Sequence, residues 1–278
     1  MNIKASNSRL SSLRNEPLVV FSDLDGTLLN SKGEVSRRTQ RAIHTCFGRG
    51  IIVVPVTARS SYSAAQVLTW LRAPVPVVCQ NGAIYFSPVE GRVTKNFPIP
   101  SAILQGLLTR LRSQNIPAVL DLDIHKCFSS EAAGLMRRLP RGPSLSVPSP
   151  HAIAEPVYTV IIERTEEADS AVDSLSEDFP DLRLVRSSDF TIDITSIRAS
   201  KVIAVTAICS DFRIEPDSSI AFGDGDNDIE MLSFVGVGIA MANASDRLRQ
   251  VADVILSYSN DDEGVARFLE TLMTENRG

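Results

Sequence analysis

The sequence predicts an α/β protein of about two domains with a parallel sheet. Three observations predict this class. Short apolar runs alternate with helical segments towards both ends of the chain, which is typical of βαβ units. These runs are continuously apolar, as expected of strands whose two faces are both covered. The length of 278 residues corresponds to about two domains of roughly 150 residues each.

The N-terminal part begins with the apolar run Leu18–Phe21, which is interpreted as a buried strand before a polar turn. The next strand candidate is rich in β-branched residues, and glycines separate it from the helix candidate that precedes it. We therefore predict, in order, a helix over Ser36–Phe47, a strand over Ile51–Val54, a helix over Ser61–Arg72 and a strand over Pro76–Cys79.

The C-terminal part repeats this alternation. Short apolar runs stand between segments with helical spacing. The predicted helices cover Lys201–Cys209, Asp228–Phe234, Ser245–Val251 and Glu263–Met273, and the predicted strands cover Ser219–Phe222, Val237–Ala240 and Val254–Leu256.

The middle of the chain has a different pattern. Asn81-Gly82, between apolar residues, predicts a hairpin turn. Five prolines between Pro140 and Pro156 predict an irregular segment. Helices are expected over Ser101–Ser113 and from about Ala168 to Phe179, and strands over Ala118–Leu122, Val157–Ile162, Leu182–Val185 and Thr191–Ile194.

The composition is that of an ordinary globular protein, with 44% hydrophobic and 22% charged residues. A net charge of −5 excludes recognition of nucleic acid or anionic lipid through an overall basic surface. Cys46, Cys79, Cys127 and Cys209 are far apart, which indicates free thiols in a reducing compartment. No apolar run is long enough to span a bilayer, so a cytoplasmic location without a membrane partner is expected. Residues 1–16 are predicted to be a flexible tail.

Two carboxylates follow the first predicted strand, in Asp23-Leu24-Asp25-Gly26-Thr27. Ligands of open α/β sheets bind at the carboxyl ends of strands, which is where this motif lies. Residues two apart in extended chain point to the same side, and the glycine permits a sharp turn after them. Such a pair suits a hard cation and an anionic substrate, although an exposed Asp-Gly turn has the same letters.

A second acidic motif, GDGDND over residues 223–228, follows the predicted strand that ends at Phe222. Asp224 and Asp228 are four residues apart, so one helical turn brings them to one side. The motif differs from an EF-hand loop and from a dinucleotide-binding glycine motif in its spacing. A solvated turn with a helix cap is the alternative interpretation.

Two further residues stand at the ends of predicted elements. Thr57 follows a strand and precedes a helix, so its hydroxyl and the nearby amides could hold phosphate oxygens or form a simple helix cap. Lys201 opens a helix, where the helix dipole does not favour a cation. Taken alone, a solvated surface lysine is the alternative there.

In their order along the chain, DLDGT, Thr57, Lys201 and GDGDND resemble the motifs of the haloacid dehalogenase (HAD) superfamily of aspartate-nucleophile hydrolases. The stretches 80–83, 236–244 and 259–265 resemble its Cof-like, type IIB branch. The resemblance implies a Rossmann-like parallel-sheet core, divided over residues 17–86 and 190–278, with an α/β cap domain over residues 87–189. In one departure from this branch, Val202 follows the motif lysine where glycine is usual.

The resemblance also implies roles for the acidic residues. Asp23 would be the nucleophile that forms an aspartyl-phosphate, and Asp25 would be the general acid and then the general base. Mg²⁺ would be held by the Asp23 carboxylate, the Asp25 backbone carbonyl and Asp224, with Asp228 as a direct or supporting ligand.

Four other residues would contact the substrate. Lys201 would offset the repulsion between carboxylate and phosphate, and Thr57 would orient the phosphate. Arg59 and Asn227 are weaker candidates for phosphate or substrate contacts, and an ion pair on the helix surface is an equal alternative for Arg59.

The expected function is hydrolysis of small phosphorylated metabolites such as sugar phosphates. A phosphomutase of the same fold and a non-enzymatic binding protein of that fold are the alternatives. Gln80, where the mutases of related cap type usually have glutamate, favours the hydrolase. The cap residues Asp121, Asp123, His125 and Lys126 are candidate specificity residues, or solvated surface residues. The chain is expected to be a monomer or homodimer.

Overall fold

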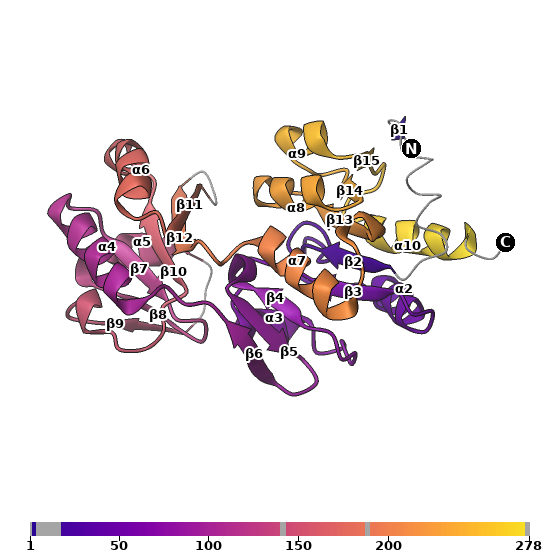
Figure 1. Ribbon diagram of the computed structural model, residues 1–278, viewed down its shortest axis with the longest axis horizontal. Helices are drawn as coiled ribbons and strands as arrows, with labels where there is room; N and C mark the ends of the chain where they lie inside the picture. Colours follow the sequence, from indigo (N-terminus) through magenta and orange to yellow (C-terminus); the bar gives the residue numbers. More distant parts are fainter. Residues whose placement is uncertain (1, 4–17, 140–142, 187–189, 276–278) are drawn as a thin grey trace.

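The computed structural model describes residues 2–3, 18–139, 143–186 and 190–275 (Figure 1). It has two bodies side by side, each with its own sheet and hydrophobic core. The chain runs from the first body into the second and then back into the first. The α/β class and the inserted second domain are thereby confirmed. No helix in the described residues is long and apolar enough to cross a membrane.

The six-stranded sheet of the first body has the order β1-β15-β14-β13-β2-β3. All of its strand pairs are parallel except that of β1 with β15. The central strands are buried along their whole length because helices cover both faces of the sheet. The strands are β1 (Asn2–Ile3), β2 (Val19–Ser22), β3 (Ile52–Pro55), β13 (Ser219–Gly223), β14 (Val237–Ala240) and β15 (Val254–Ile255).

Neighbouring residues of β2 face opposite layers of the first body. Val20 packs into the cluster that contains α2 (Arg37–Phe47) and α10 (Gly264–Glu275). Val19 and Phe21 pack into the cluster on the other face. The helices on that face are α7 (Lys201–Phe212), α8 (Ile229–Phe234) and α9 (Asp246–Val251). The short 3₁₀ helices η5 (Pro216–Ser218) and η6 (Asp226–Asp228) flank β13.

A small antiparallel sheet of order β4-β5-β6 adjoins the first body. It consists of β4 (Val77–Cys79), β5 (Ile84–Ser87) and β6 (Arg92–Asn96), with η2 (Gln80–Gly82) between the first two. The predicted Asn81-Gly82 hairpin is confirmed by the antiparallel pairing of β4 with β5. However, β4 does not join the parallel sheet as a full strand: among the described residues, a single isolated bridge, between Val56 and Val78, links it to that region.

The second body has a sheet of order β11-β12-β10-β7-β8-β9. Helices α4 (Ser101–Ser113) and α6 (Glu166–Asp178) pack on one face, and α5 (Ala133–Arg138) packs on part of the other. The remaining elements are β7 (Ala118–Asp121), β8 (Lys126–Phe128), η3 (Ser130–Ala132), β9 (Ser144–Ser146), η4 (Pro150–Ala152), β10 (Thr159–Glu163), β11 (Leu182–Arg186) and β12 (Thr191–Ser196).

Several predicted boundaries differ from the structure. The predicted core resumes at residue 190, yet β12 pairs with β10 and β11, so by sheet membership the second body extends to Ser196. The predicted cap begins at residue 87, yet β6 pairs with β5 of the first body. The helix expected over Ser61–Arg72 ends at Val67 as α3, because Leu68 and Leu71 turn into the core. Most of the predicted flexible tail lies outside the described residues, but β1 at Asn2–Ile3 pairs with β15.

Candidate active site

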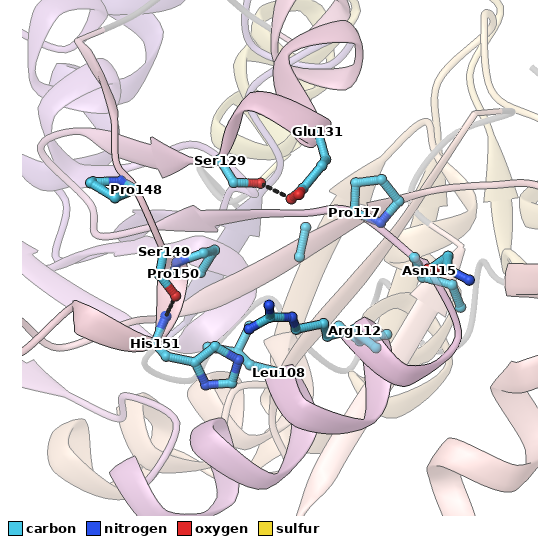
Figure 2. Close-up of a pocket in the computed structure, with 13 residues that line it drawn as sticks. Leu108, Arg112, Asn115, Pro117, Ser129, Glu131, Pro148, Ser149, Pro150 and His151 are labelled. Atoms are coloured by element: carbon cyan, nitrogen blue, oxygen red, sulfur yellow. Dashed lines mark hydrogen bonds between the residues drawn. The ribbon is translucent and has the colours of Figure 1, made fainter.

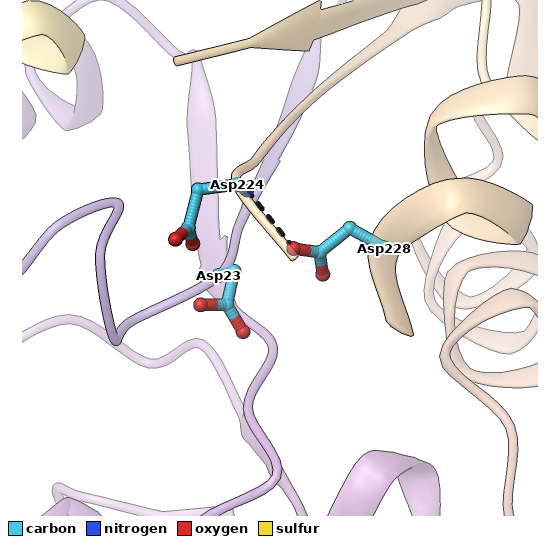
Figure 3. Close-up of side chains that lie close together, drawn as sticks. All are labelled: Asp23, Asp224 and Asp228. Carbon is cyan, nitrogen blue, oxygen red and sulfur yellow. Dashed lines mark hydrogen bonds between the residues drawn. The ribbon is translucent and has the colours of Figure 1, made fainter. Parts of the chain in front are cut away.

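The candidate site lies where β2 and β13 end side by side. These strands are parallel and pair Ser22 with Phe222, so the residues that follow them meet at one edge of the sheet. The backbone N–H of Asp23 donates to the carbonyl of Phe222 at 3.0 Å. Figure 3 shows Asp23, Asp224 and Asp228 converging there from the two acidic motifs. One carboxylate oxygen from each lies within 4.8 Å of the others.

Lys201 holds the centre of this cluster. Its Nζ donates to Asp23 Oδ1 at 2.7 Å and to Asp228 Oδ1 at 2.6 Å. The lysine side chain is only 4% exposed, so the solvated alternative is wrong. Burial disfavours the charged ammonium, but the charges of Asp228 and Asp23 more than offset it and raise the pKa of Lys201. The first residue of α7 is therefore a buried cation.

Asp23 is a buried acid that accepts a hydrogen bond from Lys201. Burial raises its pKa well above the usual range, the nearby Lys201 charge opposes that rise, and the Asp228 charge adds to it. Lys201 occupies Oδ1, and no donor from the described residues bonds Oδ2. One oxygen of the carboxylate is thus oriented and the other is available.

Asp228 is fully buried, and donors occupy both of its oxygens. Oδ1 accepts from Lys201, and Oδ2 accepts from the backbone N–H groups of Asp224 and Gly225 at 3.1 and 3.2 Å. This pattern stabilises the turn that carries Asp224. It favours the supporting role for Asp228 over that of a direct ligand.

Two residues that had no predicted role contact Asp224. Thr27 Oγ1 donates to Asp224 Oδ1 at 2.9 Å. Asn243 Nδ2 donates to the carbonyl of Gly26 at 2.8 Å and, at the longer distance of 3.5 Å, to Asp224 Oδ2. Both lie in stretches that the resemblance had singled out, so membership of those motifs was their only signal. Burial raises the pKa of Asp224 to about 6, although the Thr27 bond lowers it. Gly26 has φ +76°, and a Cβ there would lie 2.1 Å from Asp224 Oδ2.

Asp25 and Arg59 form a bidentate ion pair beside the cluster. Arg59 donates from Nε and from an Nη to the two oxygens of Asp25, both at 2.7 Å. The Asp25 side chain is 57% exposed, so it faces solvent at the edge of the site. The Asp25 bonds raise the pKa of Arg59, which keeps it charged. Arg59 thus forms its ion pair with Asp25 of the acidic motif, and not with a neighbour on the surface of α3, which begins at Ser61.

Thr57 is buried. Its Oγ1 accepts a hydrogen bond from the backbone N–H of Arg59 at 3.1 Å. Thr57 does not cap α3 (Ser61–Val67), because Ser60 is the capping residue. The Thr57 hydroxyl proton therefore stays available for another acceptor.

A cavity of about 310 Å³ opens beside Lys201, between the two bodies. Asn227 and Asn81 line it from the first body, and β11 and β12 line it from the second. Arg183 of β11 forms an ion pair across it with Glu230 of α8. The cavity also contains the ion pair between Arg247 and Asp226 at 2.6 Å, and Asp193 and Thr195 are among its lining residues.

A second cavity, of about 380 Å³, lies within the inserted body (Figure 2). Leu108, Arg112 and Asn115 line it from α4 and the turn after it, and Pro148–His151 close the opposite wall. None of the three clustered aspartates lines it, so this cavity is separate from the candidate active site.

The residues at the carboxylate cluster fit a hard divalent cation. Carboxylate oxygens are the ligands that Mg²⁺ prefers, and three of them converge here against one lysine. Burial and then the neighbouring carboxylates raise the pKa values of Asp23 and Asp224, and Lys201 opposes this rise. A dication would complete the compensation.

Comparison with known proteins agrees with this arrangement. A family model described as haloacid dehalogenase-like hydrolase matches residues 20–269. Phosphatase YwpJ of Bacillus subtilis is 26% identical, and the alignment covers 90% of this chain and 98% of that protein. The 5-amino-6-(5-phospho-D-ribitylamino)uracil phosphatase YitU of the same organism is 28% identical, over 93% and 98% of the two chains.

A solved structure has the same arrangement of elements. The structure of a haloacid dehalogenase-like hydrolase from B. subtilis superposes with a TM-score of 0.78 at 26% identity. The superposition covers 92% of this chain and 99% of the other, so it includes both bodies.

Proposed function

The chain belongs to the haloacid dehalogenase-like hydrolase family, and from that premise we propose that it is a Mg²⁺-dependent phosphatase of small phosphorylated metabolites. The observation that carries the proposal is the buried Asp23 carboxylate, which Lys201 holds by one oxygen at 2.7 Å beside Asp224 and Asp228. A protein that only binds a ligand has no need of an oriented carboxylate with a free oxygen.

Asp23 Oδ2 attacks phosphorus, the bond from phosphorus to the leaving oxygen breaks, and an aspartyl-phosphate forms. Lys201 stays on Oδ1 and offsets the repulsion between the carboxylate and the phosphate dianion. The Thr57 hydroxyl donates to a phosphate oxygen, since its proton has no other required acceptor in the site.

Asp25 supplies the proton to the leaving oxygen. Water then attacks the phosphorus of the aspartyl-phosphate while Asp25 takes a proton from it, the bond from phosphorus to the Asp23 oxygen breaks, and phosphate leaves. Asp25 is suited to exchange protons because its side chain is 57% exposed at the mouth of the site. Arg59 donates to both Asp25 oxygens at 2.7 Å and so orients the carboxyl group. While Asp25 transfers a proton, Arg59 and that proton must share the two oxygens. In this proposal Arg59 acts on Asp25 rather than on the phosphate.

Asp23, Asp224 and the backbone carbonyl of Asp25 would hold Mg²⁺, with Asp228 holding the loop around them. When bound, the ion neutralises charge on the transferring phosphoryl group. Thr27 keeps Asp224 in place for this purpose, and Asn243 holds the neighbouring carbonyl of Gly26.

The organic part of the substrate would occupy the cavity of about 310 Å³ beside Lys201. Its arginines are already paired with carboxylates, as in the pairs of Arg183 with Glu230 and Arg247 with Asp226. Hydroxyl groups can bond to both members of such a pair without separating them. Phosphorylated sugars or polyols therefore fit, and the relative YitU is named for a substrate with a phosphorylated ribityl chain.

A phosphatase assay tests the proposal. The purified chain is incubated with Mg²⁺ and a panel of sugar and polyol phosphates, and released phosphate is measured. Asp23→Asn is expected to lower kcat by about 10⁴-fold or more, as loss of a nucleophile does. Asp173→Asn, the same change at an exposed position on α6, is the matched control. Absence of turnover on the whole panel, or full activity in Asp23→Asn, contradicts the proposal.

A further inference from the structure

The inserted body reaches the first body through the turn between β7 and β8, residues Leu122–His125, here called the cap turn. It contains Asp123, which is 8% exposed and has φ +78°, an uncommon backbone conformation for a residue other than glycine. Asp121, just before the turn, is 6% exposed. These two acids belong to the four candidate specificity residues, Asp121, Asp123, His125 and Lys126, whose alternative was solvation. Both acids are buried.

Both acids bind the first body. Ser61 donates to the two oxygens of Asp123 from its backbone N–H and its hydroxyl, each at 2.5 Å. Gln80 Nε2 donates to Asp121 Oδ1 at 2.7 Å. Lys126 balances the charge of Asp121 at 3.1 Å, whereas Asp123 has backbone and hydroxyl donors only.

The two anchor points on the first body belong to one hydrogen-bonded unit. Ser61 is the first residue of α3 and closes the loop that begins at Thr57. The backbone N–H of Gln80 donates to the carbonyl of Arg59 at 2.8 Å, and that of Asn81 donates to Thr57 at 3.0 Å. The loop over residues 57–61 is therefore held by the cap turn directly at Ser61 and indirectly through Gln80.

This loop carries Arg59 and Thr57. Arg59 orients Asp25 by two bonds of 2.7 Å. Thr57 accepts a bond from the Arg59 backbone N–H, and in the proposed function its hydroxyl donates to the phosphate. We propose that Asp123 is a positioning residue of the reaction. Through its hydrogen bonds with Ser61 it holds the loop over residues 57–61, and therefore Arg59 and Thr57, in the positions that catalysis requires. The inference rests on the proposed phosphatase function and adds to it a dependence of turnover on contact with the inserted body.

The test compares Asp123→Gly with Asp123→Asn. Both residues accept a positive φ, but only asparagine keeps an acceptor for the Ser61 amide. Ser61→Ala removes the hydroxyl bond to Asp123 and leaves the bond from the Ser61 backbone N–H. Ile124→Ala changes a side chain of the same turn that is 62% exposed and is the matched control. Each variant is assayed with Mg²⁺ and p-nitrophenyl phosphate, a probe too small to depend on the cap for recognition.

We expect Asp123→Gly to lower kcat by about 10- to 100-fold with a smaller change in KM, because misplacement by about 1 Å has such an effect. Asp123→Asn should recover most of this loss, and Ile124→Ala should match the wild type. In a Thr57→Ala background the Asp123→Gly effect should shrink, since the two residues act through one loop. Additive losses, or unchanged kcat in Asp123→Gly, overturn the proposal.

Hydrogen exchange separates this inference from the proposed function. The amides of Arg59, Gln80 and Asn81 should exchange faster in Asp123→Gly even if no phosphate ester is hydrolysed. Absence of turnover in the wild type contradicts the phosphatase proposal alone. Unchanged exchange at these amides contradicts the positioning role. If Asp123→Gly does not fold, Ser61→Ala tests the positioning role instead, through its kcat and its hydrogen exchange at the same amides.

Discussion

Replacement of Lys201 by methionine should destabilise the metal-free protein severely. The change keeps a long apolar stem but removes the only cation that contacts Asp23 and Asp228 in the described residues. Two charge-assisted hydrogen bonds of 2.7 and 2.6 Å are lost from a side chain that is 4% exposed. Such bonds contribute about 1.5–3 kcal/mol each. Breaking a buried ion pair from one side costs about 3–5 kcal/mol, which we take as the expected loss.

The pH dependence of this loss has a definite sign. The pKa of Lys201 is raised in the folded protein, so its contribution is complete below the unfolded value of about 10.4. It is therefore fully present near neutral pH. In Lys201→Met the unpaired Asp23 carboxylate can take up a proton, and the raised pKa of Asp23 makes this easier in acid. The defect should thus be larger at about pH 7.5 than at about pH 5.

Thermal unfolding followed by circular dichroism in the presence of a chelator measures the effect. A loss of about 3–5 kcal/mol corresponds to a fall in Tm of roughly 6–20 °C. Lys32→Met, the same replacement at an exposed position, should change stability by less than about 0.5 kcal/mol. A Tm for Lys201→Met within about 2 °C of the wild type would refute the view that this lysine compensates the buried carboxylates.

Three further predictions concern Asp224. Gly26→Ala should lower both Mg²⁺ affinity and activity at least tenfold, because a Cβ there would lie 2.1 Å from Asp224 Oδ2. Gly33 has the same φ of +76°, but a Cβ on it would meet no atom within 4 Å. Gly33→Ala should therefore show only the modest stability loss of a strained backbone. Calorimetric titration with Mg²⁺ and thermal unfolding distinguish the two, and equal effects of the two variants would count against the steric explanation. Mg²⁺ affinity should be nearly constant above about pH 7 and fall towards tenfold per pH unit below about 6, because Asp224 has a pKa of about 6 and must be ionised to bind the ion; a flat affinity profile down to about pH 5 would contradict this. Thr27→Val removes the hydrogen bond that lowers this pKa, so the pH at which Mg²⁺ binding weakens should move upward, and an unchanged midpoint would show that the bond has no such effect.

Much of the first body was predictable because its strands are short, apolar and flanked by polar turns. The predicted helix over Ser101–Ser113 in the inserted body was also confirmed in full, since its apolar residues recur at helical spacing. The helix expected to reach Arg72 was too long, because Leu68 and Leu71 pack into the core in a way that local spacing does not reveal. Strands β6 and β8 and helix α5 were not predicted, since each is short and weakly patterned.

The positions of the acidic motifs after buried strands could be read from the order of residues, and so could the expectation that Asp23 and Asp224 lie at one sheet edge. The partners of these acids depend on the folded arrangement. Lys201 is 178 residues from Asp23 along the chain, so no local pattern predicts a bond between them. The same holds for Arg59 on Asp25 and for Asp123 on Ser61, where a polar residue that could have been solvated is paired instead. Secondary structure follows from neighbouring residues, whereas burial and pairing of charge depend on which segments the fold brings together.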